Sequence, residues 1–402
     1  MSAFKRKLTR KAFGIMRTIA PKITFGKNIY LFRDADVREI LRRDKDFTLR
    51  QINEKKIVRR IGEFLLNMDD SPQYRLEVGV LRSIILPEDP ERIRNFVRTH
   101  SRELAQKLAG KIRFDMVQDF ARIIPLRLTG DYMGFPGPDD ATMLKWNRDL
   151  FADIFLNLSD KPDIAAAGEE SAAGLNAYMS DLIAKRKQAL EHGARLPNDL
   201  LSRLLTKQQG QGPSLDDDGI RRNMAGVLMG GIEPTAKAVT NILDELFHRP
   251  DLLAEAREAA ENDAIDIVSK IAFEAFRFRP NLPVILRWNE SPQTIGGDGR
   301  KRRRLKGQKR IFAFINSAMF DGRAFPEPEA FSLDRPKADY LYFGAGLHKC
   351  YGNYINYIQI PEMLAALLRI PNLRPVPGRD GKIVKDGTFP DRWLLEVEDP
   401  NF

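Results

Sequence analysis

A short stretch near the C-terminus combines residue types that can bind a redox cofactor. It contains Cys350, the only cysteine among 402 residues, together with glycines, aromatic residues and a histidine. Its members are Phe343, Gly344, Gly346, His348, Cys350, Tyr351 and Gly352. A lone cysteine is most often a small buried hydrophobic residue. Because the glycines allow the backbone to wrap closely around a bulky flat group, we predict instead that this cysteine binds haem iron.

The sequence after the cysteine also favours an anionic sulfur. A helix is expected from Gly352 to about Leu368, so the positive end of its dipole would lie beside Cys350. This position lowers the pKa of a thiol below its usual value of about 8.5. A thiolate donates electron density to haem iron and favours cleavage of the O–O bond.

A second chemically unusual stretch lies in the middle of a long helical pattern. The apolar periodicity continues from a start near Ser214 to Phe247, and residues 230–235 read Gly-Gly-Ile-Glu-Pro-Thr. Glycine costs about 1 kcal/mol and proline about 3 kcal/mol in a helix interior. These residues predict a kink or a close ligand approach, and a packing kink without chemistry is the alternative.

Glu274 and Arg277 are three residues apart on a helix expected from about Asp263 to Phe278. Residues at this spacing share a helix face, so taken alone they favour a solvent-exposed ion pair.

The composition limits the class of protein. Hydrophobic residues make up 43% and charged residues 30% of the chain, which is typical of a soluble globular protein. One cysteine excludes an internal disulfide framework, and we find neither a secretory signal nor a membrane-spanning segment, so we expect a cytoplasmic protein. The net charge of +10 raises nucleic acid, anionic lipid or an acidic protein as partners. Nucleic acid is disfavoured because no DNA- or RNA-binding motif accompanies the charge.

Two basic segments carry this charge. Residues 1–21 predict a basic amphipathic helix whose apolar residues are Phe4, Leu8, Ala12, Ile15 and Ile19. Such a helix suits peripheral contact with an anionic membrane, although we favour a terminal helix packed on its own domain. The run from Arg300 to Arg304 predicts a hairpin tip that is either solvated or in contact with lipid or an acidic partner.

The other elements are predicted from periodicity and capping. We expect a helix capped by Asp34 or Asp36, a helix beginning at Pro72, a mostly helical stretch over 91–205, and no clear period over 56–70. Strands are expected over 29–32, 284–288 and 311–315 and in the tail after residue 368.

At this point a resemblance can be stated. The spacing of the cysteine stretch resembles the haem-binding signature of the cytochrome P450 superfamily. A long central helix, Glu274 with Arg277, and the segment from Pro328 to Arg335 follow the family's order, from about residue 30 to the end. The resemblance implies a single mainly α domain over 1–402 with a smaller β region, a long central helix over the haem, and haem b as cofactor.

The resemblance also implies roles for residues. Cys350 would be the axial ligand and metal-binding residue, and Phe343 the ring beside it, in a loop built with Gly344, Gly346 and Gly352. His348 and Arg287 would meet the haem propionates. Tyr74 stands where a propionate-binding histidine is common, and Val78 where a basic residue is usual. Glu274, Arg277 and Arg335 would form a buried structural triad.

The central helix departs from the family pattern. Glu233 occupies the position of the acid, but Pro234 replaces the threonine whose hydroxyl helps deliver protons. Thr235 lies about 100° further around the helix, so it is poorly placed to substitute. We therefore expect proton delivery to use Glu233, the carbonyl that Pro234 leaves without a donor, and water, unless the enzyme bypasses this step.

The implied function is mono-oxygenation of an apolar small molecule by a monomer. Electrons would come from a ferredoxin- or flavodoxin-type donor that docks near Lys349 and Arg75 or Arg82. The pocket would be lined by the 56–70 loop, residues 151–158, Met229 and Ile232, and a lipid, terpene, steroid or aromatic substrate would fit it. A peroxide-dependent haem-thiolate enzyme is the alternative that Pro234 favours, and a non-catalytic haem sensor or carrier is a third.

Overall fold

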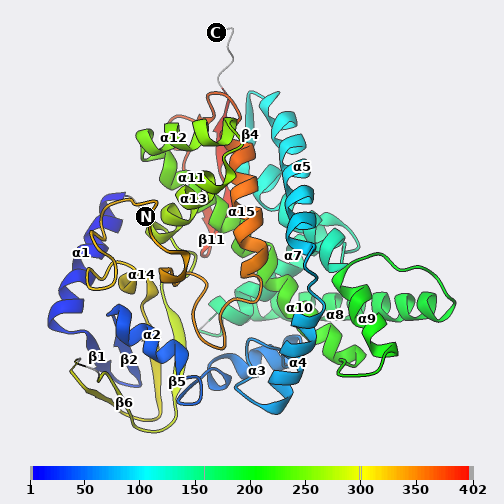
Figure 1. The fold of residues 1–402 in the computed structure, drawn as a ribbon, viewed down its shortest axis with the longest axis horizontal. Helices are drawn as coiled ribbons and strands as arrows, with labels where there is room; N and C mark the ends of the chain where they lie inside the picture. The colour runs from blue at the N-terminus through cyan, green and yellow to red at the C-terminus, as the bar shows by residue number, and fades with distance from the viewer. Residues whose placement is uncertain (1–2, 158, 298, 300, 398–402) are drawn as a thin grey trace. The chain divides into compact units, whose positions relative to one another are not determined.

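The structure is a computed structural model that describes residues 3–157, 159–297, 299 and 301–397 (Figure 1). It is mainly α-helical with short strands, as predicted. Backbone contacts divide the chain into two compact units, the first with residues 1–54, 66–71 and 273–351 and the second with the remainder. Within the described ranges, no helix is long and apolar enough to cross a membrane.

The first unit is built on a five-stranded mixed sheet in the order β1-β2-β8-β5-β3. Its strands are β1 (Lys22–Phe25), β2 (Asn28–Leu31), β3 (Phe47–Thr48), β5 (Ile285–Asn289) and β8 (Lys309–Ala313). Ile29 and Leu31 of β2 are buried and alternate with half-exposed residues, which is the pattern of a strand with one covered face. A hairpin of β6 (Gln293–Ile295) and β7 (Arg303–Leu305) lies in the basic region, as predicted, but Arg303 and Arg304 belong to strand β7 and not to the tip.

Helices α1 (Ala3–Ile19), α2 (Asp34–Arg42) and α14 (Ile315–Ala318) also belong to this unit. The cap predicted for α2 is wrong, because Arg33 is the N-cap and makes no side-chain cap hydrogen bond. Asp34 instead pairs with Arg38 at 2.7 Å, and Asp36 pairs with Arg303 of β7. Tertiary ion pairs therefore replace the local capping interaction that the sequence suggested.

Helix α1 packs on its own unit, but through the face opposite to the one that its apolar pattern favoured. Leu8, Ala12, Ile15 and Ile19 are exposed, whereas Arg17 is buried. The interpretation that the apolar stripe is the packing face is wrong. The side chain of Phe4 lies outside the described residues.

The second unit is a helical assembly with two small antiparallel sheets. Its helices are α4 (Pro72–Ser83), α5 (Asp89–Ala109), α6 (Ile123–Leu128), α7 (Asp140–Phe151), α8 (Pro162–Glu191), α9 (Leu200–Gln209), α10 (Asp217–Gly231), α11 (Glu233–Phe247), α12 (Pro250–Glu261) and α15 (Asn353–Leu368). Three π-helical turns interrupt them, η1 (Val117–Ala121), η2 (Thr129–Met133) and η3 (Ala152–Leu156). Helices α5 and α15 pack side by side (Figure 1).

The sheets of this unit come mostly from the tail, as predicted. They are β4-β12-β9 and the hairpin β10-β11. Their strands are β4 (Arg113–Asp115), β9 (Arg374–Pro375), β10 (Val384–Asp386), β11 (Phe389–Arg392) and β12 (Leu394–Glu396). Helix α13 (Ile265–Phe278) begins in the second unit and ends in the first.

The predicted long central helix is divided into α10 and α11 at Ile232. Ile232 has φ −90° and ψ −69°, and Pro234 lies in the first turn of α11. Since proline has no N–H, the hydrogen bond that would continue α10 across residue 234 cannot form. The predicted kink is confirmed, and it is sharp enough to end one helix and begin another.

The segment 56–70 is more regular than expected at its start, because α3 (Arg50–Arg60) occupies it as far as Arg60. The description of this segment as a loop is therefore wrong for residues 56–60. Met1, Ser2, Leu158 and Arg300, which the predictions for the N-terminal segment, the pocket and the basic run included, lie outside the described residues.

Candidate functional site

The loop that carries Cys350 is closed by its own backbone. The Cys350 N–H donates to the carbonyl of Phe343 at 2.8 Å. Gly344 and Gly346 have φ of +71° and +75°, a left-handed conformation that glycine adopts without strain. A Cβ atom on Gly346 would collide with the carbonyl oxygen of Leu41 in α2. Both glycines are thus needed for the turn, and Gly346 also for the close approach of α2, while the predicted wrapping of the backbone around haem stays a prediction.

The thiol of Cys350 is half-exposed and lies just before α15, whose N-cap is Gly352. The first N–H groups of a helix have no partners within the helix and favour a negative charge beside them. As predicted, a helix begins directly after this stretch, with its N-cap two residues beyond Cys350 in the chain. This arrangement favours the thiolate form, which is the form that binds a metal.

Arg287 is a buried cation that lacks a close anionic partner among the described residues. Its side chain is 2% exposed, Nη1 donates to the carbonyl of Leu286 at 2.9 Å, and Nε has no hydrogen-bond partner. Burial lowers the pKa of Arg287 to about 10, although the charges of Asp44 and Asp69 oppose the shift. A guanidinium in this situation is expected to meet a carboxylate.

His348 lies near Arg287. Burial, and then the charge of Arg287, lower the pKa of His348 to about 3, so the ring is neutral at physiological pH. A neutral histidine and a partly satisfied arginine can both donate hydrogen bonds to a carboxylate. The donor set in this unit therefore fits the propionate groups of haem, and the cysteine loop fits its iron.

Phe343 is fixed by an aromatic cluster. Its ring centroid lies 5.0 Å from that of Tyr342, 6.3 Å from Phe273 and 6.5 Å from Phe276. Aromatic pairs at these separations add stability beyond the area that they bury. The cluster holds the start of the cysteine loop in place.

The predicted triad is present and buried. Arg277 donates to both oxygens of Glu274, at 2.6 and 3.0 Å, and both side chains are fully buried. Arg335 reaches the same carboxylate at 3.3 Å, and the hydroxyl of Tyr340 donates to it at 2.8 Å. The exposed ion pair that the spacing alone favoured is wrong, because a third residue and a tyrosine cover the pair.

In the second unit, Glu233 is held by two arginines. Arg122 Nη2 lies 2.5 Å from Oε1 and Arg148 Nη2 lies 3.0 Å from Oε2, while Glu233 is 1% exposed. Arg148 also pairs with Asp391 at 2.9 Å and with Asp386 at 3.4 Å. Although burial acts to lower it, the pKa of Arg148 is raised because these carboxylates favour its charged form.

Arg122 and Arg148 could not be identified from the sequence alone as partners of Glu233. They come from the end of η1 and from α7, and no local spacing connects them with α11. The acidic position in the middle of the helix was the only signal. A buried carboxylate at such a position must have a cationic partner somewhere in the chain.

The hydroxyl of Thr235 contacts residues of α15 and does not take the place of the threonine that Pro234 replaces. Its hydroxyl donates to the carbonyl of Gly231 at 2.7 Å and contacts Asn356 Oδ1 at 3.0 Å. Gln359 Nε2 lies 3.3 Å from the hydroxyl oxygen of Thr235. The hydroxyl is therefore already engaged, which agrees with the expectation that Thr235 does not substitute for the missing threonine.

Gly230, just before the break, faces space that the described protein atoms leave empty. A Cβ atom on Gly230 would meet no atom within 4 Å, whereas one on Gly226, a turn earlier, would collide with the ring of Phe64. The same helix is thus packed tightly at one turn and open at the next. The open turn is where a ligand could approach the backbone.

Tyr74 lies on α4 in the second unit and is 3% exposed. Its predicted contact with haem stays a prediction. Lys349, Arg75 and Arg82 are all exposed, as a docking role for an acidic donor would require.

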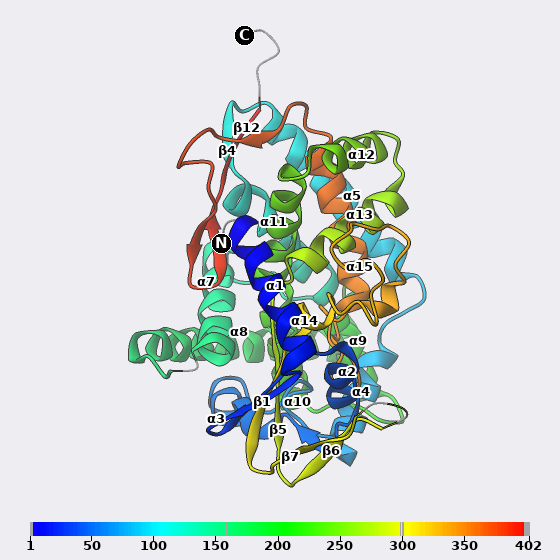
Figure 2. The same cartoon turned by 90° about the vertical axis from the view of Figure 1, so that its left-hand side faces the viewer.

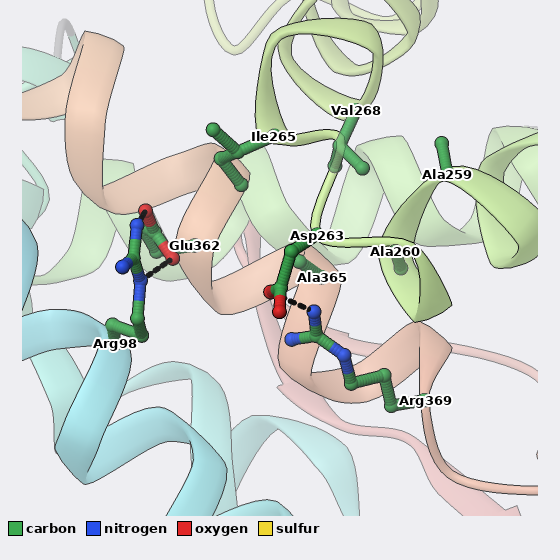
Figure 3. A pocket seen from close by; sticks show the side chains of 9 residues that line it. All are labelled: Arg98, Ala259, Ala260, Asp263, Ile265, Val268, Glu362, Ala365 and Arg369. Carbon is green, nitrogen blue, oxygen red and sulfur yellow. Dashed lines mark hydrogen bonds and ion pairs between the residues drawn. The ribbon is translucent and has the colours of Figure 1, made fainter.

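A polar pocket elsewhere in the second unit is a weak candidate for chemistry (Figure 3). Glu362 of α15 accepts from Arg98 of α5 at 3.0 and 3.2 Å, and Asp263 pairs with Arg369. The remaining lining is apolar, from the α12–α13 region and α15. Because both carboxylates already have arginine partners, the pocket stabilises the packing of helices and presents no reactive group.

The fold and the cysteine loop together define a mainly helical haem-thiolate class of protein. The model of the family "Cytochrome P450" matches residues 29–390. The chain therefore belongs to the cytochrome P450 family, and it is an oxidoreductase of the monooxygenase type with haem b as its cofactor.

Individual relatives are distant but long matches. Pulcherriminic acid synthase of Bacillus subtilis is 24% identical over 80% of this chain and 78% of its own length. The C-19 steroid 1alpha-hydroxylase of Sorangium cellulosum is 28% identical over 70% of this chain and 67% of its own length. The crystal structure of CalO2 superposes with a TM-score of 0.82 at 20% identity, covering 99% of this chain and 98% of that one, and so shows the same fold.

Proposed function

We propose that this protein binds haem b through the sulfur of Cys350 and hydroxylates an apolar small molecule. The observation that carries the proposal is the closed loop from Phe343 to Cys350, which presents the thiol at the start of α15. Haem held by a thiolate supplies the dioxygen chemistry that inserts oxygen into a C–H bond. Arg287 and His348 would hold its propionates, and Tyr74 would add a hydroxyl donor.

The class of substrate is supported by the relatives and by the helix break. The Sorangium cellulosum relative is named a steroid hydroxylase. In this chain, Met229 and Ile232 flank Gly230 and are almost fully buried, so apolar side chains surround the break and a ligand that approaches it needs few polar groups. A steroid, terpene or lipid meets this requirement.

We expect the carbonyl of Gly230 at the helix break, and not Glu233, to bind the water that supplies protons. Glu233 is fixed between two guanidinium groups, so its carboxylate is held in one orientation. Pro234 cannot donate to the carbonyl of Gly230, which leaves that oxygen available to hold a water molecule. We propose that water on this carbonyl delivers protons during oxygen activation, with Glu233 as a positioning residue.

Electrons would come from a separate acidic protein of ferredoxin or flavodoxin type. Arg75 and Arg82 lie seven residues apart on α4, so they share one face of that helix, and both are exposed. They offer positive charge of the kind that steers such a partner, and Lys349 of the first unit is exposed as well. We propose that the protein works as a monomer in this complex.

The proposal is tested by spectroscopy and by turnover. The reduced protein with carbon monoxide should show the red-shifted Soret band of thiolate ligation, and Cys350→Ala should lose it. Substrate turnover should require both dioxygen and electrons fed from NAD(P)H. A band that survives in Cys350→Ala would refute the ligand assignment, and turnover with a hydroperoxide in the absence of any reductant would favour the peroxide-dependent alternative.

A further inference from the structure

Helix α1 presents an apolar stripe to solvent. Leu8 is 58% exposed, Ile15 57% and Ile19 78%, and Ala12 lies exposed between them. Their spacing of four, three and four residues places them on one face of the helix. In Figure 2, α1 lies in front of α14 of the same unit, and no other element of that unit is drawn over it.

The inward face of α1 combines an aromatic side chain with polar ones, and the ring centroid of Phe13 lies 5.8 Å from that of Phe32 and 5.4 Å from that of Phe314. Arg17 is buried and donates to the carbonyl and the hydroxyl of Ser317 at 2.9 and 3.1 Å. Arg10 pairs with Glu329 at 3.0 Å, and its guanidinium lies 5.2 Å from the ring centroid of Phe320. These contacts fix which side faces outward, so the apolar stripe cannot turn inward without leaving a buried cation unsatisfied.

The hairpin that follows α1 carries a further exposed apolar side chain. Phe25, at the end of β1, is 75% exposed. The hairpin is joined to the basic region by two lysines, because Lys22 donates to the carbonyl of Arg304 at 2.9 Å and Lys309 donates to that of Gly26 at 2.8 Å. Apolar and cationic groups therefore lie on one connected surface of the first unit.

The two segments that form this surface contain many basic residues and no acidic ones. Residues 1–31 contain eight Lys or Arg and no Asp or Glu, and residues 300–310 also contain eight and none. Several of these cations are exposed, namely Lys11, Lys27, Lys301, Arg302, Arg304 and Lys306. An exposed apolar stripe with a cationic border is the pattern of a surface that lies on an anionic bilayer.

We propose that the outward face of α1 and the tip of the β1–β2 hairpin form a binding surface for an anionic lipid membrane. Leu8, Ile15, Ile19 and Phe25 enter the boundary between headgroups and acyl chains, and the surrounding lysines and arginines contact lipid phosphates. A bilayer fits this convex face better than a protein pocket would, because single apolar side chains need no complementary hole in it. The proposal does not depend on the activity proposed above.

The test uses the full chain with haem bound and vesicles of phosphatidylcholine with or without phosphatidylglycerol. Co-sedimentation should be at least about tenfold stronger with phosphatidylglycerol, and high salt should weaken it. The double variant Ile15→Gln/Ile19→Gln should reduce binding about tenfold, since two apolar side chains no longer insert. The matched control is Ile112→Gln, because Ile112 is 74% exposed in the second unit and should leave binding unchanged.

Three results would overturn the proposal. The first is equal binding of the double variant and the unmodified protein, and the second is binding that does not respond to phosphatidylglycerol. The third is a dimer in sedimentation velocity that the double variant abolishes, because the stripe would then belong to a second copy of the chain. Retention of the carbon-monoxide Soret band by the double variant shows that it is still folded.

Discussion

Arg148 Nη2 lies 3.0 Å from Oε2 of Glu233, and Arg122 holds the other oxygen of the same carboxylate at 2.5 Å. A single buried acid thus neutralises part of the charge on two buried arginines. Asp391 and Asp386 complete the neutralisation from the tail of the chain. The acid of the central helix therefore connects α11 to η1, α7 and the β10–β11 hairpin.

Glu233→Gln should destabilise the protein strongly. It removes the negative charge and leaves two arginines facing each other in a buried position, for which a loss of about 3 to 5 kcal/mol in the free energy of unfolding is expected. Urea unfolding followed by circular dichroism measures it. The control is Glu54→Gln, which breaks the exposed pair with Arg50 and should cost under about 1 kcal/mol. Equal losses of unfolding free energy in the two variants would show that the contacts of Glu233 with Arg122 and Arg148 do not stabilise the protein.

Replacement of Pro234 separates the roles of the hydroxyl and the carbonyl. Pro234→Val restores the N–H that binds the Gly230 carbonyl and adds no hydroxyl, so product formed per NAD(P)H consumed should fall several-fold, by about three- to tenfold. Pro234→Thr has the same shape but adds a hydroxyl, and it should match or exceed the unmodified protein. If the valine variant retains full coupling, the Gly230 carbonyl has no part in proton delivery.

Two glycines of α10 should respond in opposite ways to alanine. In Gly226→Ala the new methyl group meets the ring of Phe64, so unfolding free energy should fall by about 1 to 3 kcal/mol despite the better helix propensity. In Gly230→Ala the methyl group enters empty space, so stability should hold while the binding of substrate weakens. Thermal unfolding and spectral titration with a bound ligand measure the two effects. A stable Gly226→Ala protein would contradict this packing.

Lys237 of α11 should make stability depend on pH. Burial, and then the charge of Lys385, lower its pKa to about 8, and its ammonium lies 5.8 Å from the ring centroid of Phe389. Between pH 8 and about 10.5 the unfolded chain binds the proton and the folded chain does not, so stability rises with pH in this window. Lys237→Met should therefore melt above the unmodified protein at pH 7, and the difference should shrink as pH approaches 10.

The control for this experiment is Lys185→Met on α8, where the lysine is exposed and paired with Asp181. Its difference in melting temperature from the unmodified protein should not shrink over the same pH range. An equal pH dependence in both variants would show that the effect comes from net charge and not from burial of Lys237.

The parts of the site that depend on local sequence could be predicted. The glycines of the cysteine stretch predicted a tightly wrapped backbone, which Gly344 and Gly346 permit because they adopt left-handed conformations without strain. Pro234 predicted a break because it lacks the N–H that a helix interior requires. Glu274 and Arg277 alone suggested an exposed pair. Their burial became predictable only through the resemblance, because Arg335 and Tyr340 reach them from about 60 residues away.

The side of α1 that packs on the protein and the partners of Glu233 could not be predicted from local sequence. Periodicity in α1 shows that an apolar stripe exists, but the partner of Arg17 is Ser317, 300 residues away, and this contact decides which side packs. Likewise, the partners of Glu233 are 85 residues or more distant in the chain. Tertiary hydrogen bonds overrode local patterns at both positions.

The hydrogen bond from Cys350 N–H to the carbonyl of Phe343 has a consequence for assembly. The geometry of the cysteine loop is encoded within the loop itself, so the thiol can be presented before any cofactor arrives. The loop would then already have its final conformation when haem binds, and it would not need to fold around the cofactor. The apoprotein is accordingly expected to accept haem added after folding.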